Sequence, residues 1–122
     1  MNIEDQVVSL EIAKKLKDLG FKQDSLFYWI KVKNIEVYGV SYVINICGTN
    51  LEFEKIYSAF TASELGELLP LWFDCAKRET QDWTCRFFDK SSNLHHHSFA
   101  ATMVDAMAKM LIFLIESGLM KV

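Results

Sequence analysis

Three consecutive histidines, His95, His96 and His97, are the residues whose type most directly suggests chemistry. Side chains of an extended strand alternate between its two faces, so we expect His95 and His97 to project from the same face. Two imidazoles on one face are candidate ligands for zinc or nickel when a neighbouring Cys, Asp or Glu completes the site. No second ligand cluster at a diagnostic spacing accompanies them, so we favour a solvated edge strand and expect no metal or other cofactor.

The cysteines, Cys47, Cys75 and Cys85, are odd in number and form no Cys-x-x-Cys pair, which argues against a disulfide framework and a zinc ribbon. A catalytic thiol needs a lowered pKa, usually from a nearby His or a helix N-terminus, whereas Cys75 and Cys85 fall at core-facing positions of a predicted hairpin. Their spacing would allow a disulfide, but a reducing compartment argues against it. Because no pair of acids is identifiable in a cleft either, we expect no enzymatic activity.

Residues 71–89 predict a β-hairpin with its turn near Thr80, and several side-chain pairs agree on one register. In this register opposite positions add up to 160, which joins opposite charges and two aromatic residues on one face, as Asp74 with Arg86, Arg78 with Asp82, and Trp72 with Phe88. The other face is more apolar and is expected to meet the core. We therefore predict an interaction face that consists of Trp72, Asp74, Arg78, Arg86 and Phe88, and that suits a protein partner or, as the alternative, single-stranded nucleic acid.

Other segments must position this hairpin, and the first of them lie before residue 50. Ser9 is a plausible N-cap for a helix over residues 10–19, and Gly20 ends that helix. Residues 26–33 and 36–46 are rich in aromatic and β-branched side chains and predict a second hairpin.

The remaining segments predict two further helices and a strand. Residues 61–69 have the spacing of a capping box followed by a short helix, which Pro70 ends. Residues 94–99 predict a last strand. Residues 102–118 predict a long helix that begins with a second capping box, at Thr102.

This order predicts an α+β fold in a single domain over residues 1–122, with one antiparallel sheet of four or five strands. The N-terminal helix and the long C-terminal helix are expected to pack on that sheet, with the short middle helix between them in the chain. The C-terminal helix is apolar around most of its circumference and must be buried on several sides. With 51% hydrophobic residues, we expect a homo-oligomer, and Met103, Met107 and Met110 are expected to contact either the N-terminal helix or a second copy of the chain.

Charge and hydropathy limit the classes of partner. A net charge of -3 and a pI near 5.6 disfavour a protein that gains its affinity by neutralising phosphates, so a protein partner is the better prediction. The N-terminus opens with acidic residues rather than a secretory signal, and no run reaches the roughly 18 apolar residues of a membrane span. We expect a cytoplasmic protein that does not associate with membranes.

Three segments together resemble small proteins encoded by bacteriophages and prophages: SLEIAKKLKDLGFKQDSLFYW, YSAFTASELGELLP and AKMLIFLIESGLM. The resemblance spans most of the chain and is most specific in ELGELLP and AKMLI. The order of helices and strands is also similar to that of phage α-β-α sandwich domains. The resemblance implies a phage-associated protein of the bacterial host cell and carries no reaction or catalytic residue. We thus expect a non-enzymatic protein that acts through protein contacts, with a nucleic-acid accessory protein as the alternative and a small metal-binding enzyme as a third class.

Overall fold

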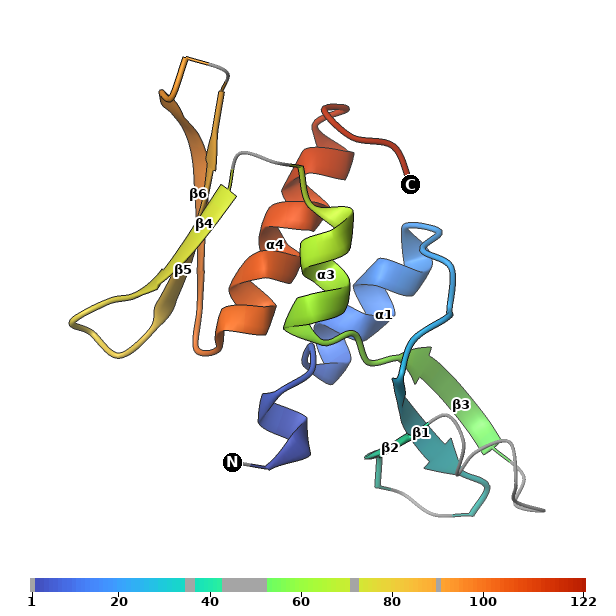
Figure 1. Cartoon of the computed structure of the whole chain (residues 1–122). Coiled ribbons are helices and arrows are strands. Elements are labelled where there is room, and N and C mark those ends of the chain that lie inside the picture. The colour runs from blue at the N-terminus through green and yellow to red at the C-terminus, as the bar shows by residue number, and fades with distance from the viewer. Residues whose placement is uncertain (1, 35–36, 43–52, 71–72, 90) are drawn as a thin grey trace. The chain divides into compact units, whose positions relative to one another are not determined.

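The computed structural model describes residues 2–34, 37–42, 53–70, 73–89 and 91–122 (Figure 1). The fold is α+β, as predicted. The described strands form two separate three-stranded antiparallel sheets, so the prediction of one sheet with four or five strands is wrong. The chain divides into two compact units, Met1–Thr61 and Ala62–Val122, and each unit contains one of the sheets.

The N-terminal unit begins with a short 3-10 helix, η1 (Ile3–Asp5), which is followed by the helix α1 (Leu10–Asp18). Ser9 occupies the N-cap position, as predicted. The backbone N–H groups of Gly20 and Phe21 donate back to carbonyls of the last turn, at 3.0 and 3.1 Å, in a Schellman motif. Gly20 has a φ of 95°, which glycine adopts without steric cost. This residue therefore ends the helix where the sequence predicts.

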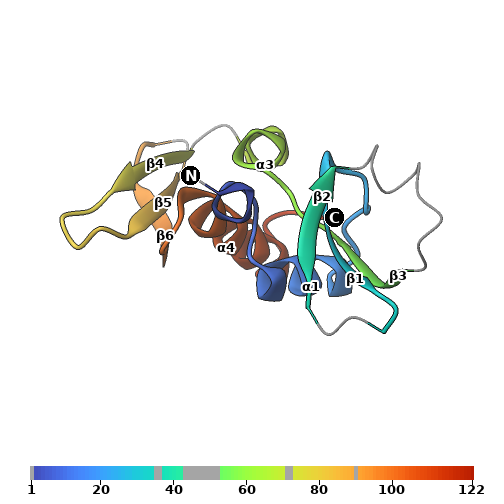
Figure 2. The ribbon, with the colours of Figure 1, turned by 90° about the horizontal axis from the view of Figure 1, so that it is seen from below.

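The N-terminal sheet has β1 (Phe27–Val32) at its centre, between β2 (Gly39–Tyr42) and β3 (Phe53–Ser58). β1 and β2 form the predicted hairpin. β3 is a strand that the sequence pattern did not predict, and it pairs antiparallel with the other edge of β1. The β1–β2 hairpin is thus completed to a three-stranded sheet by a strand of its own unit. α1 lies beside this sheet, where the Lys17 ammonium donates to the Ile56 carbonyl at 3.2 Å (Figure 2).

The C-terminal unit contains α3 (Ala62–Leu68), then β4 (Phe73–Lys77), β5 (Trp83–Phe88) and β6 (Leu94–Ala100), and finally α4 (Met103–Glu116). Its sheet has the order β4–β5–β6, so β6 is an edge strand, as predicted. α4 packs on this sheet and also contacts α3 (Figure 1). The prediction that the first and last helices share one sheet is wrong, because α1 packs on the sheet of the other unit.

The predicted register of β4 and β5 is confirmed. Opposite residues add up to 160 along both strands: Phe73–Phe87, Asp74–Arg86, Cys75–Cys85, Ala76–Thr84 and Lys77–Trp83. The Arg78 N–H donates to the Asp82 carbonyl at 2.8 Å, and the Gln81 N–H donates to the Arg78 carbonyl at 2.9 Å. Gln81 has a φ of 71°, as in a three-residue hairpin loop that closes with a left-handed residue. The pair that Trp72 was predicted to form with Phe88 lies outside the described residues.

α4 begins and ends as predicted. The Thr102 hydroxyl accepts a hydrogen bond from the Asp105 N–H at 3.2 Å. At the other end Gly118 has a φ of 79°, and the Leu119 N–H donates to the Leu114 carbonyl at 2.9 Å, which is a second Schellman motif. The buried positions of α4 occur around most of its circumference, as predicted: Val104, Ala106, Met107, Ala108, Met110, Leu111 and Leu114. Among the described residues, no helix has the length and apolar character that crossing a bilayer requires.

Candidate functional site

One face of the sheet β4–β6 packs against α4. Cys85 is fully buried on this face. The Ser98 hydroxyl donates to the Ala106 carbonyl of α4 at 2.7 Å, and the His96 ring stacks on the Phe113 ring with 3.5 Å between their centroids. Because successive side chains of a strand point to opposite faces, the neighbouring positions point away from α4.

Ala76 and Thr84 lie on this side of the sheet, and Thr84 is buried. The other side chains here, with the two residues that flank the β4–β5 loop, form what we call the open face: Asp74, Arg78, Asp82, Arg86, Phe88, Leu94, His97 and Phe99. The Arg86 guanidinium donates to both carboxylate oxygens of Asp74, at 2.7 and 2.7 Å. The hydrogen bonds and charge of Asp74 raise the pKa of Arg86 above its ordinary value, so the guanidinium stays charged. Arg86 also lies 5.5 Å from the centroid of the Phe88 ring. The register therefore places the Arg86 guanidinium between the Asp74 carboxylate and the Phe88 ring, and these two contacts fix its position.

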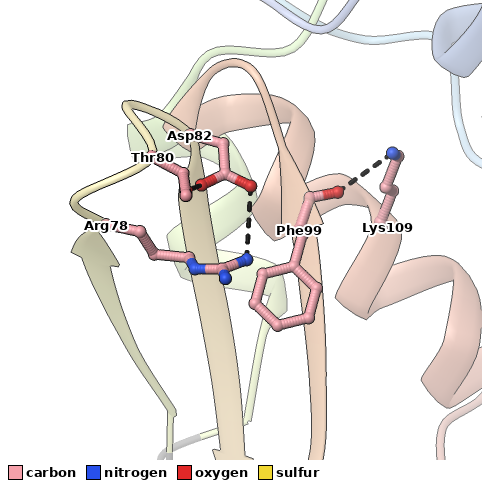
Figure 3. A network of polar contacts seen from close by, with 5 residues as sticks. All are labelled: Arg78, Thr80, Asp82, Phe99 and Lys109. Carbon is pink, nitrogen blue, oxygen red and sulfur yellow. Dashed lines mark hydrogen bonds and ion pairs between the residues drawn. The ribbon is translucent and has the colours of Figure 1, made fainter.

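A second ion pair lies at the loop end of the open face (Figure 3). Arg78 pairs with Asp82 at 3.3 Å, and the Thr80 hydroxyl donates to the other oxygen of the same carboxylate. The Arg78 guanidinium lies over the Phe99 ring, 4.5 Å from its centroid, as in a cation–π contact. The Lys109 ammonium of α4 donates to the Phe99 backbone carbonyl at 3.0 Å. This hydrogen bond thus satisfies a backbone carbonyl of β6, an edge strand whose unpaired backbone groups are open to pairing with another strand.

The histidines of β6 lie in different surroundings. His97 is exposed, and its ring contacts the Phe99 ring with 4.7 Å between centroids. His95 instead approaches the Phe87 ring at 5.5 Å. The pairing of β5 with β6 shifts between Phe87 and Phe88, and this bulge interrupts the simple alternation on which the expected shared face of His95 and His97 rested. In the part of the chain that the structure describes, no three His, Cys, Asp or Glu residues are grouped to hold a metal ion.

The structure brings together most of the predicted interaction face. The predicted members found on the open face are Asp74, Arg78, Arg86 and Phe88, whereas Trp72 lies outside the described residues. β6 contributes Leu94, His97 and Phe99, which the sequence reasoning missed because it treated the hairpin alone. Alternation along residues 97–99 would have identified His97 and Phe99, if the pairing of that strand with β5 had been predicted, whereas Leu94 shares this face only because the register shifts between Phe87 and Phe88.

The methionines of α4 do not form an exposed surface. Met107 and Met110 are 5% and 0% exposed, so both side chains are buried within the chain. A Cβ atom added at Gly66 of α3 would lie 3.8 Å from Met107 Cε, which shows that Met107 packs against α3. Met103 is half-buried.

No protein-family model matches this chain, and neither a curated protein nor a solved structure matches it. The function of the open face must therefore be inferred from its geometry, charge and exposure.

Proposed function

We propose that this chain is a non-enzymatic protein that acts through protein–protein contacts made by the open face. The observation that carries this proposal is the pairing of both arginines with carboxylates of the same face, Arg86 with Asp74 and Arg78 with Asp82. The formal charges of these pairs cancel. Binding to nucleic acid gains most of its affinity from cations that neutralise phosphates, whereas protein interfaces are enriched in aromatic residues and arginine.

The apolar members of the open face support the same proposal. Leu94 is 50% exposed and Phe99 is 38% exposed, although burial of either side chain would be favourable. Two ion pairs and two ring contacts hold the arginines in place, so these long side chains lose little conformational freedom when a partner binds. A surface that exposes apolar and aromatic side chains beside already ordered arginines suits a protein partner.

We propose a second copy of the chain as the first partner to test. A two-fold interface uses the same patch on both subunits, so the patch must be complementary to itself. The open face carries charges of both signs beside apolar side chains, which meets this requirement. The resemblance to phage-encoded proteins supports a further proposal, that the assembly serves a phage-associated role in the bacterial cytoplasm.

The test compares two leucines of nearly equal exposure. Leu94, on the open face, is 50% exposed, and Leu119, which follows α4, is 52% exposed. Sedimentation velocity over a range of concentrations should show self-association of the unmodified chain. Leu94→Ser should raise the dissociation constant about fivefold, equivalent to about 1 kcal/mol, whereas Leu119→Ser should leave it unchanged. A 14.1 kDa monomer at every concentration, or equal effects of the two variants, would exclude self-association through this face.

Single-stranded nucleic acid is the second candidate partner, because the Arg78–Phe99 stack offers a platform for bases. Phosphates would have to displace Asp74 and Asp82 from the guanidinium groups. If nucleic acid is the partner, fluorescence anisotropy should show binding of oligothymidylate at low salt, and the double variant Asp74→Asn with Asp82→Asn should bind more tightly. An absence of binding at low salt would remove this candidate.

A further inference from the structure

Cys75 and Cys85 are direct neighbours across β4 and β5, on the opposite side of the sheet from the open face. The hydrogen bond from Arg78 to Asp82 makes those two residues a hydrogen-bonded pair of the ladder. Because hydrogen-bonded and non-hydrogen-bonded pairs alternate, Cys75 and Cys85 form a non-hydrogen-bonded pair. The Cα atoms of such pairs are about 4.5 Å apart and their side chains are close, which is within the range for a disulfide.

The two thiols differ in access. Cys85 is fully buried, whereas Cys75 is half-buried. A small reagent that approaches from solvent therefore meets Cys75 first, and Cys85 lies next to Cys75 on the paired strand.

The two thiols also differ in acidity. The Cys85 thiol donates a hydrogen bond to Cys75, and this bond lowers the pKa of Cys75 despite the opposing effects of burial and of the Asp74 charge. Donation of the same bond, together with burial, raises the pKa of Cys85. Because the thiolate is the reactive form of cysteine, Cys75 is the better nucleophile by ionisation as well as by access.

We propose that Cys75 and Cys85 are a site of reversible oxidation, in which Cys75 reacts with a small external disulfide and Cys85 then closes a disulfide across β4 and β5. This inference does not depend on the proposed function. In the first step the Cys75 thiolate attacks one sulfur of the external disulfide, and the S–S bond of that molecule breaks. A mixed disulfide forms on Cys75, and one small thiolate leaves and takes up a proton.

In the second step Cys85 loses its proton and attacks the Cys75 sulfur. The mixed disulfide breaks, the Cys75–Cys85 bond forms, and a second small thiol leaves. Two protein thiols are thereby oxidised while one external disulfide is reduced to two thiols, so atoms and electrons balance. Once Cys75 is in the mixed disulfide it carries no negative charge, and this removes one of the effects that oppose ionisation of Cys85. The disulfide covalently links β4 and β5, the two strands that carry Asp74 and Arg86 on the open face.

The experiment uses the full chain with Cys47→Ser, because Cys47 lies outside the described residues and would add a third thiol. Reduced protein is incubated with glutathione disulfide and quenched with acid, and intact mass and thiol alkylation are measured. The parent should lose both alkylatable thiols without retaining glutathione. Cys85→Ser, and Cys85→Ala as a second variant, should stop at one glutathione on Cys75. Cys75→Ser should retain a free Cys85 that does not react.

Three results would overturn the proposal. These are a stable glutathione adduct on the parent, retention of both free thiols in the parent, and reaction of Cys85 in the Cys75→Ser variant at the rate of Cys75 in the Cys85→Ser variant. The incubation is repeated in urea as a control for variant folding. The difference in reactivity between the two cysteines should disappear when the chain unfolds, so a difference seen without urea reports the folded structure.

Discussion

The substitution Ser58→Ala should stabilise this protein, because it removes a buried hydroxyl that has no hydrogen-bond partner among the described residues. Ser58 ends β3 and is 0% exposed, and its Oγ atom makes no such bond. The substitution does not alter the backbone N–H of residue 58, which donates to the side-chain carbonyl of Gln23 at 2.8 Å. Alanine therefore keeps the backbone contacts and removes only the unpaired polar atom.

The size of the effect follows from two opposing contributions. An unpaired buried hydroxyl costs about 1–3 kcal/mol of folding free energy, and alanine avoids this cost. The lost van der Waals contacts of one oxygen offset part of the gain. We expect the free energy of unfolding to rise by about 1 kcal/mol, which corresponds to a Tm increase of about 4 °C for a chain of this size.

Ser98→Ala is the matched control, because it removes the same atom from another buried strand residue. Ser98 is 8% exposed, but its hydroxyl donates to the Ala106 carbonyl at 2.7 Å. This variant should lose about 0.5–1.5 kcal/mol. Urea titration with tryptophan fluorescence measures both variants, since Trp29 lies in the unit of Ser58 and Trp83 in the unit of Ser98. The slopes with urea should match the parent, so that the midpoints report stability.

The decisive result is the sign of the difference between the two variants. Opposite signs support the reasoning. An equal loss in both variants would refute it, because the Ser58 hydroxyl would then be hydrogen-bonded in solution as fully as that of Ser98.

Two further predictions concern the hairpin loop and β6. Gln81→Gly should raise the free energy of unfolding by about 0.5–1 kcal/mol, because Gln81 has a φ of 71°, where glycine has no steric cost; Gln81→Ala should leave it unchanged, and a gain from alanine would contradict the prediction. Burial and the neighbouring His97 and His95 lower the pKa of His96 from its ordinary 6.5. Below pH 6.5 the unfolded chain therefore binds a proton that the folded chain does not, so this contribution to stability is fully present above pH 6.5 and is lost as the pH falls from 6.5 through the lowered pKa of the folded state. Thermal unfolding at a series of pH values should show that the Tm decreases below pH 6.5, and His96→Phe should make this decrease smaller. An unchanged pH dependence of the Tm in the variant would contradict the assignment to His96.

The local elements could be predicted because their determinants lie a few residues apart. Gly20 and Gly118 end two helices with left-handed backbone, and Thr102 caps the start of α4. The ion pair of Asp74 with Arg86 followed from the same short-range logic, since a three-residue loop leaves little freedom in the register of its strands.

The missed features depend on residues that are distant in the chain. β3 pairs with β1, as in Tyr28 with Ser58, and nothing in the local pattern of β3 selects that partner over the β4–β5 hairpin. The burial of Met107 likewise depends on α3, which supplies Gly66 at the contact. The hydrophobic pattern of α4 showed that it must be covered but did not show which element covers it.

Patterns in the sequence were sufficient to predict the α+β class, the ends of the helices, the hairpin register and the charge pairs on one face of that hairpin. Hydrogen bonds within helices and across short loops decide these features, and they form between residues close in the chain. Three features arise only in the folded chain: the division of the strands into two sheets, the burial of Met107 and Met110, and the addition of Leu94, His97 and Phe99 to the open face by β6. Those outcomes depend on which apolar surfaces meet, and burial of apolar area is not directional. A pattern of residues therefore states how much surface must be covered, and the packing of distant elements decides what covers it.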